Sequence, residues 1–211
     1  MKWTNFIVGL IKVVIGVLIT LSALYGYHFE FSNELTFISN FVTGIFIAVD
    51  GLILVIFRKP LPTFLYLLLL PAMLTDFAST VLTILHIKRF NLRKMFLFMH
   101  AINPIVVILV YLFLTPKEET NKKRNLLKIL LAPLLTMCYW LYDYIRFLRV
   151  GKLMYGLVPT NDLTFIVAML IALAYYALVI LLLFGLFKLK LFIQNKVTLI
   201  KDTNSKQITT N

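Results

Sequence analysis

The feature that most constrains this chain is a series of six apolar segments, each long enough to cross a lipid bilayer as a helix. They cover roughly residues 5–26, 35–57, 63–86, 95–115, 126–146 and 163–187. A transmembrane helix needs about 20 mostly apolar residues in succession. Short polar breaks such as HFEFSNE, FRKP and KRFNLRK separate the segments. The pattern predicts an all-α integral membrane protein, a bundle of six transmembrane helices.

Composition excludes the main alternatives to this fold. The chain is 61% hydrophobic and only 14% charged, which leaves too little polar surface for a soluble domain of 211 residues. A membrane β-barrel would show shorter segments in which apolar and polar residues alternate. We therefore expect one transmembrane domain over residues 1–187 and a basic cytoplasmic tail over residues 188–211, in a multi-pass protein of the cell membrane.

The chain has a formal net charge of +12, a basic balance that nucleic-acid-binding proteins also show. Basic residues, however, gather at the ends of the apolar segments, where they orient the chain and attract anionic lipid head groups. More of them fall on the side that would carry both termini, which predicts cytoplasmic termini, although the basic segment KRFNLRK at 88–94 opposes this orientation. Membrane lipids, rather than nucleic acid, are the expected partners.

Polar residues inside the apolar segments recur at helical spacing, so each group shares one helix face. The second segment has Thr36, Asn40, Thr43 and Asp50; the third has Asp76, Thr80, Thr83 and His86; the fourth has His100 and Asn103; the fifth has Thr136, Tyr139 and Asp143. Polar groups are costly in hydrocarbon and normally face the interior of a helix bundle. These four stripes predict a common polar interior.

Depth brings two of these residues together. Thr36 lies at the head of the second segment and His100 lies near the head of the fourth, and both segments run in the same direction across the membrane. Asp143 is near the same level, at the end of the oppositely directed fifth segment. A hydroxyl, an imidazole and a carboxylate at one depth are the groups that nucleophilic acyl transfer requires.

Two short motifs at these residues are LTFISN at 35–40 and HAINP at 100–104, and a weaker third is CYWLYDYIRFLRVGKLMYGLVP at 138–159. In these motifs and in the order of its helices the chain resembles the androgen-induced (FAR-17a-like) family of six-helix membrane hydrolases. It is most similar to their uncharacterised bacterial relatives. The loop KEETNKKRN lacks the histidine-containing turn of the animal members, which leaves the substrate open.

The resemblance implies a chemistry. Animal members of the family are threonine hydrolases that cleave fatty acid esters of hydroxy fatty acids, with an essential Thr and His that correspond to Thr36 and His100. It therefore implies a membrane-embedded hydrolase of lipid (fatty acyl) esters, with Thr36 as nucleophile and His100 as general base. Supporting roles are assigned by helical geometry: Asn40 and Asn103 as oxyanion donors, Asp76 or Asp143 as the carboxylate that orients the imidazole, and His86 as an alternative base.

Other readings remain open at this level. Asn40 and Asn103 could instead be hydrogen-bond links between helices. The whole protein could bind or transport a lipid or a small solute without catalysis, with Asp50 and Asp76 as proton or ion sites. The chain has three histidines, in no metal-binding spacing and too few for two bis-histidine haems, so we expect no metal and no cofactor. The sequence leaves the oligomeric state undetermined.

Overall fold

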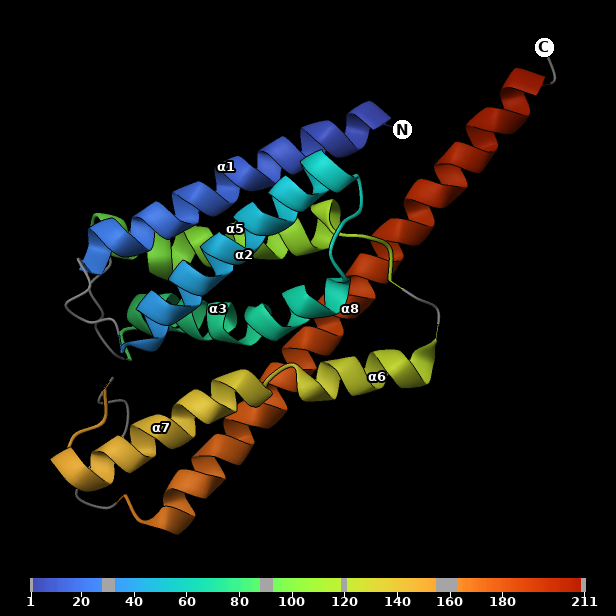
Figure 1. The fold of residues 1–211 in the computed structure, drawn as a ribbon. Helices are drawn as coiled ribbons and strands as arrows, with labels where there is room; N and C mark the ends of the chain where they lie inside the picture. The colour runs from blue at the N-terminus through green and yellow to red at the C-terminus, as the bar shows by residue number, and fades with distance from the viewer. Residues whose placement is uncertain (1, 28–32, 88–92, 119–120, 155–162, 210–211) are drawn as a thin grey trace.

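The computed structural model describes residues 2–27, 33–87, 93–118, 121–154 and 163–209. These residues form helices and short connections, and no strand occurs among them (Figure 1). The elements are α1 (Lys2–Tyr27), α2 (Leu35–Phe57), α3 (Thr63–Ile84), α4 (Met95–Leu97), η1 (Phe98–Ile102), α5 (Asn103–Leu109), η2 (Val110–Leu114), α6 (Lys122–Leu131), α7 (Leu134–Val150) and α8 (Phe165–Thr209), where η1 and η2 are π-helical turns.

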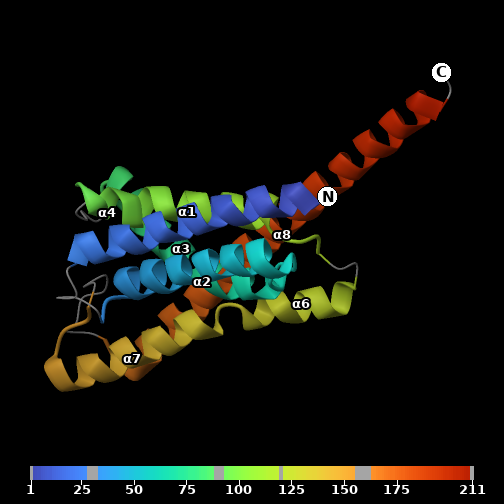
Figure 2. The same ribbon diagram turned by 45° about the horizontal axis from the view of Figure 1, so that its top comes forward.

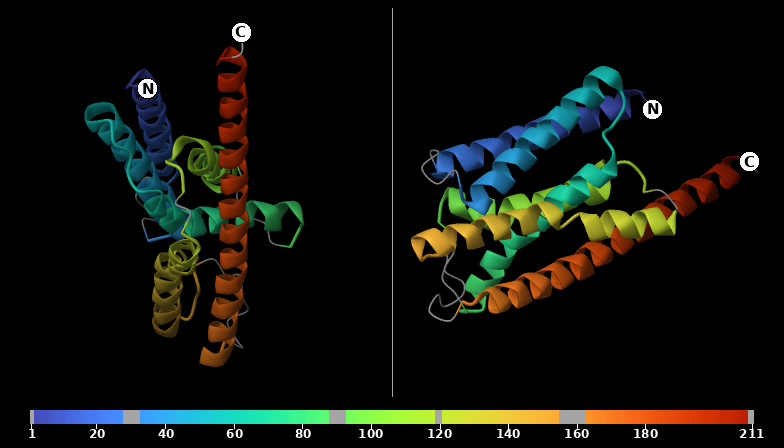
Figure 3. Two further views of the ribbon diagram at one scale, coloured as in Figure 1. Left: turned by 90° about the vertical axis from the view of Figure 1, so that its right-hand side faces the viewer. Right: turned by 60° about the horizontal axis from the view of Figure 1, so that its bottom comes forward.

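Six helical stretches of the described chain are long and apolar enough to span a membrane. They are Thr4–Gly26, Leu35–Phe57, Thr63–Ile84, Met95–Leu114, Lys123–Val150 and Phe165–Val197. The prediction of an all-helical protein with six such helices is confirmed. The two ends of the described chain lie toward the same end of the bundle in Figures 1 and 3. That this end faces the cytoplasm stays a prediction from the charge pattern.

Helices α1 and α2 lie side by side along most of their length (Figure 2), and glycines allow their close approach. A Cβ added to Gly16 would overlap the backbone of Ala48, and one added to Gly44 would overlap the backbone of Thr20. Membrane helices gain packing contacts when small residues let their backbones approach. In this helix pair, Lys12 of α1 contacts Asp50 in the polar stripe of α2.

The last two spans differ from the sequence expectation in their continuity. The fifth span consists of α6 and α7, which are separated by Ala132 and Pro133, and proline lacks the N–H that a continuous helix would use. The sixth span belongs to α8, which continues as one helix to Thr209. No break in this helix marks the predicted boundary between residues 187 and 188, and α8 runs past the other helices in Figure 3.

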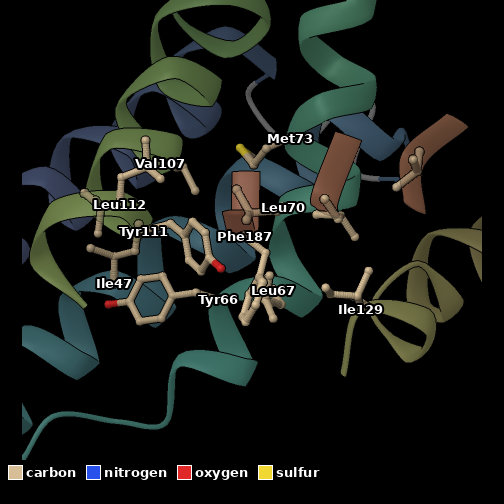
Figure 4. Close-up of a cluster of buried hydrophobic side chains, with 14 of the residues drawn as sticks. Ile47, Tyr66, Leu67, Leu70, Met73, Val107, Tyr111, Leu112, Ile129 and Phe187 are labelled. Atoms are coloured by element: carbon tan, nitrogen blue, oxygen red, sulfur yellow. The ribbon is translucent and has the colours of Figure 1, made fainter. Parts of the chain in front are cut away.

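The apolar core gathers toward the end of the bundle where α2 finishes and α3 starts. Figure 4 shows its centre, which α2, α3, α5, η2, α6 and α8 all supply. Its members include Ile47, Tyr66, Leu67, Leu70, Met73, Val107, Tyr111, Ile129 and Phe187. The opposite end of the bundle, where α2 begins, holds the predicted site residues instead.

Candidate functional site

A cavity of about 460 Å³ lies between α2, α3, η1, α7 and α8. Its wall is mainly leucine, isoleucine, valine and alanine. Polar side chains lie on this apolar wall, among them Thr36, Asp76, Ser79, His100, Tyr139 and Asp143. The structure thus brings Thr36 and His100, the pair predicted from the sequence, to one cavity together with two of the carboxylates.

Thr36 lies in the first turn of α2 and is 1% exposed. Its hydroxyl Oγ1 donates a hydrogen bond to Asp76 Oδ1, at 2.9 Å. The other carboxylate oxygen of Asp76, Oδ2, accepts from Ser39 Oγ at 2.5 Å and from Asn40 Nδ2 at 3.2 Å. All three donors are uncharged, and within the described ranges no ion pair includes Asp76. The carboxylate is therefore buried beside a cavity and is held by neutral donors alone.

The spacing of these donors explains why α2 supplies all of them. Positions 36, 39 and 40 are separated by three and four residues, which places them on one face of a helix. That face meets α3 at Asp76, in the second half of α3. The sequence left open whether Asp76 or Asp143 orients His100, and in this geometry the carboxylate of Asp76 accepts from the hydroxyl of Thr36.

His100 lies in the π-helical turn η1 and is 5% exposed. Its ring nitrogen Nδ1 is 2.9 Å from Ser79 Oγ, and its backbone carbonyl accepts a hydrogen bond from Thr80 Oγ1 at 2.9 Å. The ring of Phe96 is nearly parallel to the imidazole, with an interplanar angle of 13° and a centroid separation of 6.5 Å. These contacts hold both the ring and the backbone of His100.

The two asparagines link helices. Asn40 Nδ2 donates to the carbonyl of Met99 at 3.3 Å as well as to Asp76, and Asn40 Oδ1 accepts from Asn103 Nδ2 at 2.7 Å. Asn103 Nδ2 also donates to Ser22 Oγ at 2.7 Å, which reaches α1. Neither amide is part of the cavity wall. This geometry supports the hydrogen-bond-link reading of Asn40 and Asn103 and gives no support to an oxyanion role.

The two remaining predicted residues have other surroundings. Asp143 lines the cavity and is 5% exposed, and both of its oxygens accept from the backbone N–H of Met154, at 3.1 and 3.3 Å. These hydrogen bonds stabilise the turn that follows α7. His86 lies past the end of α3, is exposed, and has a left-handed backbone with φ of 58°. His86 is not among the residues that line the cavity.

Sequence reasoning missed Ser39 and Ser79, which contact the two central groups of the site. A signal was present, since Ser39 follows Thr36 by three residues and Ser79 follows Asp76 by three. Residues three apart in a helix lie on the same face. Serine in a membrane helix commonly bonds only its own backbone, so the spacing alone did not distinguish these two from the rest.

A second group of buried polar side chains lies away from this cavity. Lys12 Nζ is 2.7 Å from Asp50 Oδ2, and both side chains are 0% exposed. The hydroxyl of Tyr66 also donates to Asp50 Oδ2, and the backbone N–H of Leu61 donates to Asp50 Oδ1 at 2.8 Å. The ammonium of Lys12 lies 5.3 Å from the centre of the Tyr66 ring. We refer to Lys12, Asp50 and Tyr66 as the Lys12 triad.

The same three groups occur again where α8 passes the end of η2. Lys190 Nζ is 3.4 Å from Glu118 Oε1, and the hydroxyl of Tyr111 donates to that same oxygen at 3.3 Å. Lys190 lies 4.4 Å from the centre of the Tyr111 ring and donates to Thr115 Oγ1 at 2.5 Å. Lys190, Glu118 and Tyr111 form the Lys190 triad. In both triads the buried ammonium is matched by a carboxylate and faces a tyrosine ring.

The described residues contain no group of three or more His, Cys, Asp or Glu side chains placed to hold a metal ion. Comparison with known proteins adds no relative, since no model of a protein family, no curated protein and no solved structure matches the chain. The resemblance carried by LTFISN and HAINP therefore stays a prediction. Its weaker third motif extends over residues 155–159, which lie outside the described residues.

Proposed function

We propose that this protein is a membrane-embedded threonine hydrolase that cleaves fatty acyl esters, with Thr36 as the nucleophile and Asp76 and His100 as its acid–base groups. The observation that supports this most is the hydrogen bond from the Thr36 hydroxyl to Asp76, at 2.9 Å, on the wall of a cavity that His100 also lines. A threonine hydroxyl is a weak nucleophile and needs an adjacent base to accept its proton.

Acylation follows from the acceptor of that hydrogen bond. As Thr36 Oγ1 forms a bond to the ester carbonyl carbon, its proton passes to Asp76, the group already in hydrogen-bond contact. The carbon–oxygen bond to the leaving alcohol then breaks, and Asp76 returns the proton to that alcohol. This revises the expectation from the sequence, which gave the first proton transfer to His100. The products of this step are a free alcohol and an acyl-Thr36 ester.

Deacylation is the step assigned to His100. Its imidazole takes a proton from a water molecule in the cavity, and the water oxygen attacks the acyl carbon. The bond to Thr36 Oγ1 breaks, and the imidazolium returns the proton to the threonine oxygen. A fatty acid leaves, and every group is back in its resting form. Asp76 thus serves the first half of the reaction and His100 the second.

The surroundings favour an apolar ester as substrate. The cavity wall is mainly aliphatic and lies between helices that are apolar enough to span a membrane. A second cavity of about 330 Å³, with a mainly apolar wall, lies between α7 and α8 and shares Trp140, Leu153 and Ile171 with the first. An acyl chain placed there would leave water, and burial contributes about 0.8 kcal/mol for each CH₂ group.

The test is covalent labelling of the detergent-solubilised protein with a lipophilic fluorophosphonate, followed by a long-chain ester assay. Wild type is expected to label at Thr36, and Thr36→Ala to remain unlabelled. Asp76→Asn is expected to slow labelling by about 100-fold or more, because it removes the general base. His100→Ala should still label, but it should accumulate acyl-Thr36 with an ester substrate, detected by mass spectrometry of the intact protein.

Thr75→Ala is the matched control, because this hydroxyl lines the same cavity but contacts Pro71 and Tyr175 instead of Asp76. It should label as wild type does. Normal labelling of Asp76→Asn together with loss in His100→Ala would return the first proton transfer to His100. A folded wild-type protein that neither labels nor hydrolyses esters, yet binds a fatty acyl probe in the cavity, would overturn the hydrolase proposal in favour of lipid binding.

A further inference from the structure

The hydroxyl of Ser79 contacts the imidazole of His100, and it has a second partner. Its hydroxyl oxygen lies 2.6 Å from the backbone carbonyl oxygen of Asp76 and 2.9 Å from His100 Nδ1. Two oxygens at 2.6 Å need a hydrogen between them, and a carbonyl has none to give. The single hydroxyl hydrogen of Ser79 is therefore donated to the backbone carbonyl of Asp76.

The direction of this hydrogen bond determines the tautomer of His100. Since the hydroxyl hydrogen points to the carbonyl, Ser79 Oγ meets His100 Nδ1 with a lone pair, and the ring nitrogen must supply the hydrogen. A neutral imidazole carries only one N–H, so its other nitrogen, Nε2, is the one that holds a lone pair. The hydrogen bond of one ring nitrogen thus determines which nitrogen can act as a base.

The backbone of His100 is held by the next residue of α3. In an α-helix the carbonyl of His100 would accept from residue 104, but that residue is Pro104 and has no N–H. Thr80 Oγ1 donates to this carbonyl in its place, at 2.9 Å. The π-helical turn at this point is closed by a hydrogen bond from the N–H of Asn103 to the carbonyl of Phe98. Adjacent residues of α3 therefore fix the ring and the backbone of His100 together.

We infer that Ser79 is a positioning residue, which keeps His100 in the Nδ1–H tautomer so that Nε2 accepts the proton of the attacking water. This assignment rests on the proposed hydrolase function for its consequence, but the tautomer itself does not depend on activity. The spacing of Ser79 from Asp76 places both on one face of α3, but the role of Ser79 comes from the contact between α3 and η1. Ser79 lines the same cavity as His100 and is 9% exposed.

The test is ¹⁵N NMR of histidine-labelled protein in detergent, combined with the two half-reactions of ester turnover. The chain has three histidines, so the signal of His100 is assigned by its absence in His100→Ala. Wild type is expected to show a protonated Nδ1 and an unprotonated Nε2. Ser79→Ala should shift the hydrogen toward Nε2, whereas Ser79→Thr, which keeps the hydroxyl, should restore the wild-type spectrum.

In turnover, Ser79→Ala should slow deacylation by about 10- to 100-fold, the range known for hydrogen bonds that orient metal-binding histidines. The rate of fluorophosphonate labelling at Thr36 should stay unchanged, a separation that general loss of structure would not produce. Thr83→Ala is the control, since this hydroxyl donates to the carbonyl of Ser79 one turn further along α3. It should leave both the spectrum and the deacylation rate as in wild type.

The positioning role of Ser79 and the hydrolase proposal can be overturned independently of each other. An unchanged His100 spectrum in folded Ser79→Ala overturns the positioning role, whatever the enzyme activity. A spectrum that changes as expected in a protein that neither labels nor hydrolyses esters keeps the tautomer assignment and overturns the hydrolase proposal.

Discussion

The Asp76 site and the Lys12 triad each bury a carboxylate within the spanning helices, and they do so in opposite ways. Asp50 has an ammonium at 2.7 Å, a tyrosine hydroxyl and a backbone N–H, so its charge is matched. Asp76 has three neutral donors and a cavity beside it. A buried charge is expensive unless it is paired. The paired carboxylate suits a structural role, and the carboxylate without a cation suits a functional one.

The triads and the Asp76 site also differ in the helices that they connect. The Lys12 and Lys190 triads join α1, α2, α3, η2 and α8 beside the apolar core, and Tyr66 and Tyr111 belong to that core (Figure 4). The Asp76 site joins α2 to α3, and its neighbour His100 is held from α3. Substitutions in the triads should therefore change stability, whereas substitutions at Asp76 should change activity.

The largest expected effect is on catalysis. Asp76→Asn should reduce ester hydrolysis by about 100- to 10,000-fold, the range for losing a general base. Its cost to the free energy of unfolding should be only about 1 kcal/mol, because the amide oxygen can keep the donors of Oδ2 and the hydroxyl of Thr36 can turn to accept from the amide N–H. Steady-state hydrolysis and thermal unfolding in detergent measure the two effects on the same sample. Loss of stability as large as that of Lys12→Met would remove the distinction between the two carboxylates.

The second effect is on stability. Lys12→Met leaves Asp50 as a buried charge without its cation and should lower the free energy of unfolding by about 3–5 kcal/mol. The double variant Lys12→Met/Asp50→Leu removes both charges and should recover most of that loss. Thermal unfolding in detergent measures both. Equal destabilisation of the single and double variants would show that packing, rather than charge pairing, explains the cost.

The third effect is on the packing of α1 against α2, the helices that supply Lys12, Asp50 and Thr36. Gly16→Ala places a Cβ against the backbone of Ala48 and should destabilise the fold by about 1–3 kcal/mol. Gly185→Ala is the matched control in α8, where an added Cβ has no neighbour within 4 Å. The control should be neutral or stabilising by up to about 1 kcal/mol, since alanine favours helix more than glycine does. A neutral result for Gly16→Ala would contradict the close approach of α1 and α2.

The smallest effect is expected on the cavity wall away from Asp76. Thr75 Oγ1 lies 2.6 Å from the hydroxyl of Tyr175 and links α3 to α8. Thr75→Ala should cost about 0.5–1.5 kcal/mol, the usual value of one hydrogen bond, and should leave labelling of Thr36 intact. Thermal unfolding and fluorophosphonate labelling check the two parts. Loss of labelling here would mean that the whole wall, and not Asp76 in particular, activates the threonine.

Much of the architecture could be predicted because it depends on local composition. Apolar segments of about 20 residues specify spanning helices whatever packs against them. The polar stripes gave the buried positions of Thr36, Asn40, Asp76, His100 and Asp143, because burial within a bundle follows helical periodicity. The continuity of α8 past residue 187 was missed, since its mixed basic and apolar sequence gives no clear helix signal there.

Within the site, the sequence predicted Thr36, Asp76 and His100, but it missed Ser39 and Ser79 and did not predict which side chains contact each other. Depth placed Thr36 and His100 together, but it did not show that Asp76 would lie beside Thr36. A helix can tilt or shift along its neighbour without changing its sequence pattern, so depth counted from the ends of apolar segments is imprecise. The hydrogen bond from Thr36 to Asp76 depends on how α2 meets α3.

The sequence by itself thus determined that this protein is helical, that six helices of the described chain can span a membrane, and that Thr36, Asn40, Asp76, His100 and Asp143 lie inside. These properties follow from hydrophobicity and the period of the helix. Only the tertiary structure decided that Asp50 pairs with a lysine, that Asp76 accepts from a threonine, and that Ser79 contacts His100. Partners across a bundle are set by the rotation and offset of packed helices, which no single segment encodes.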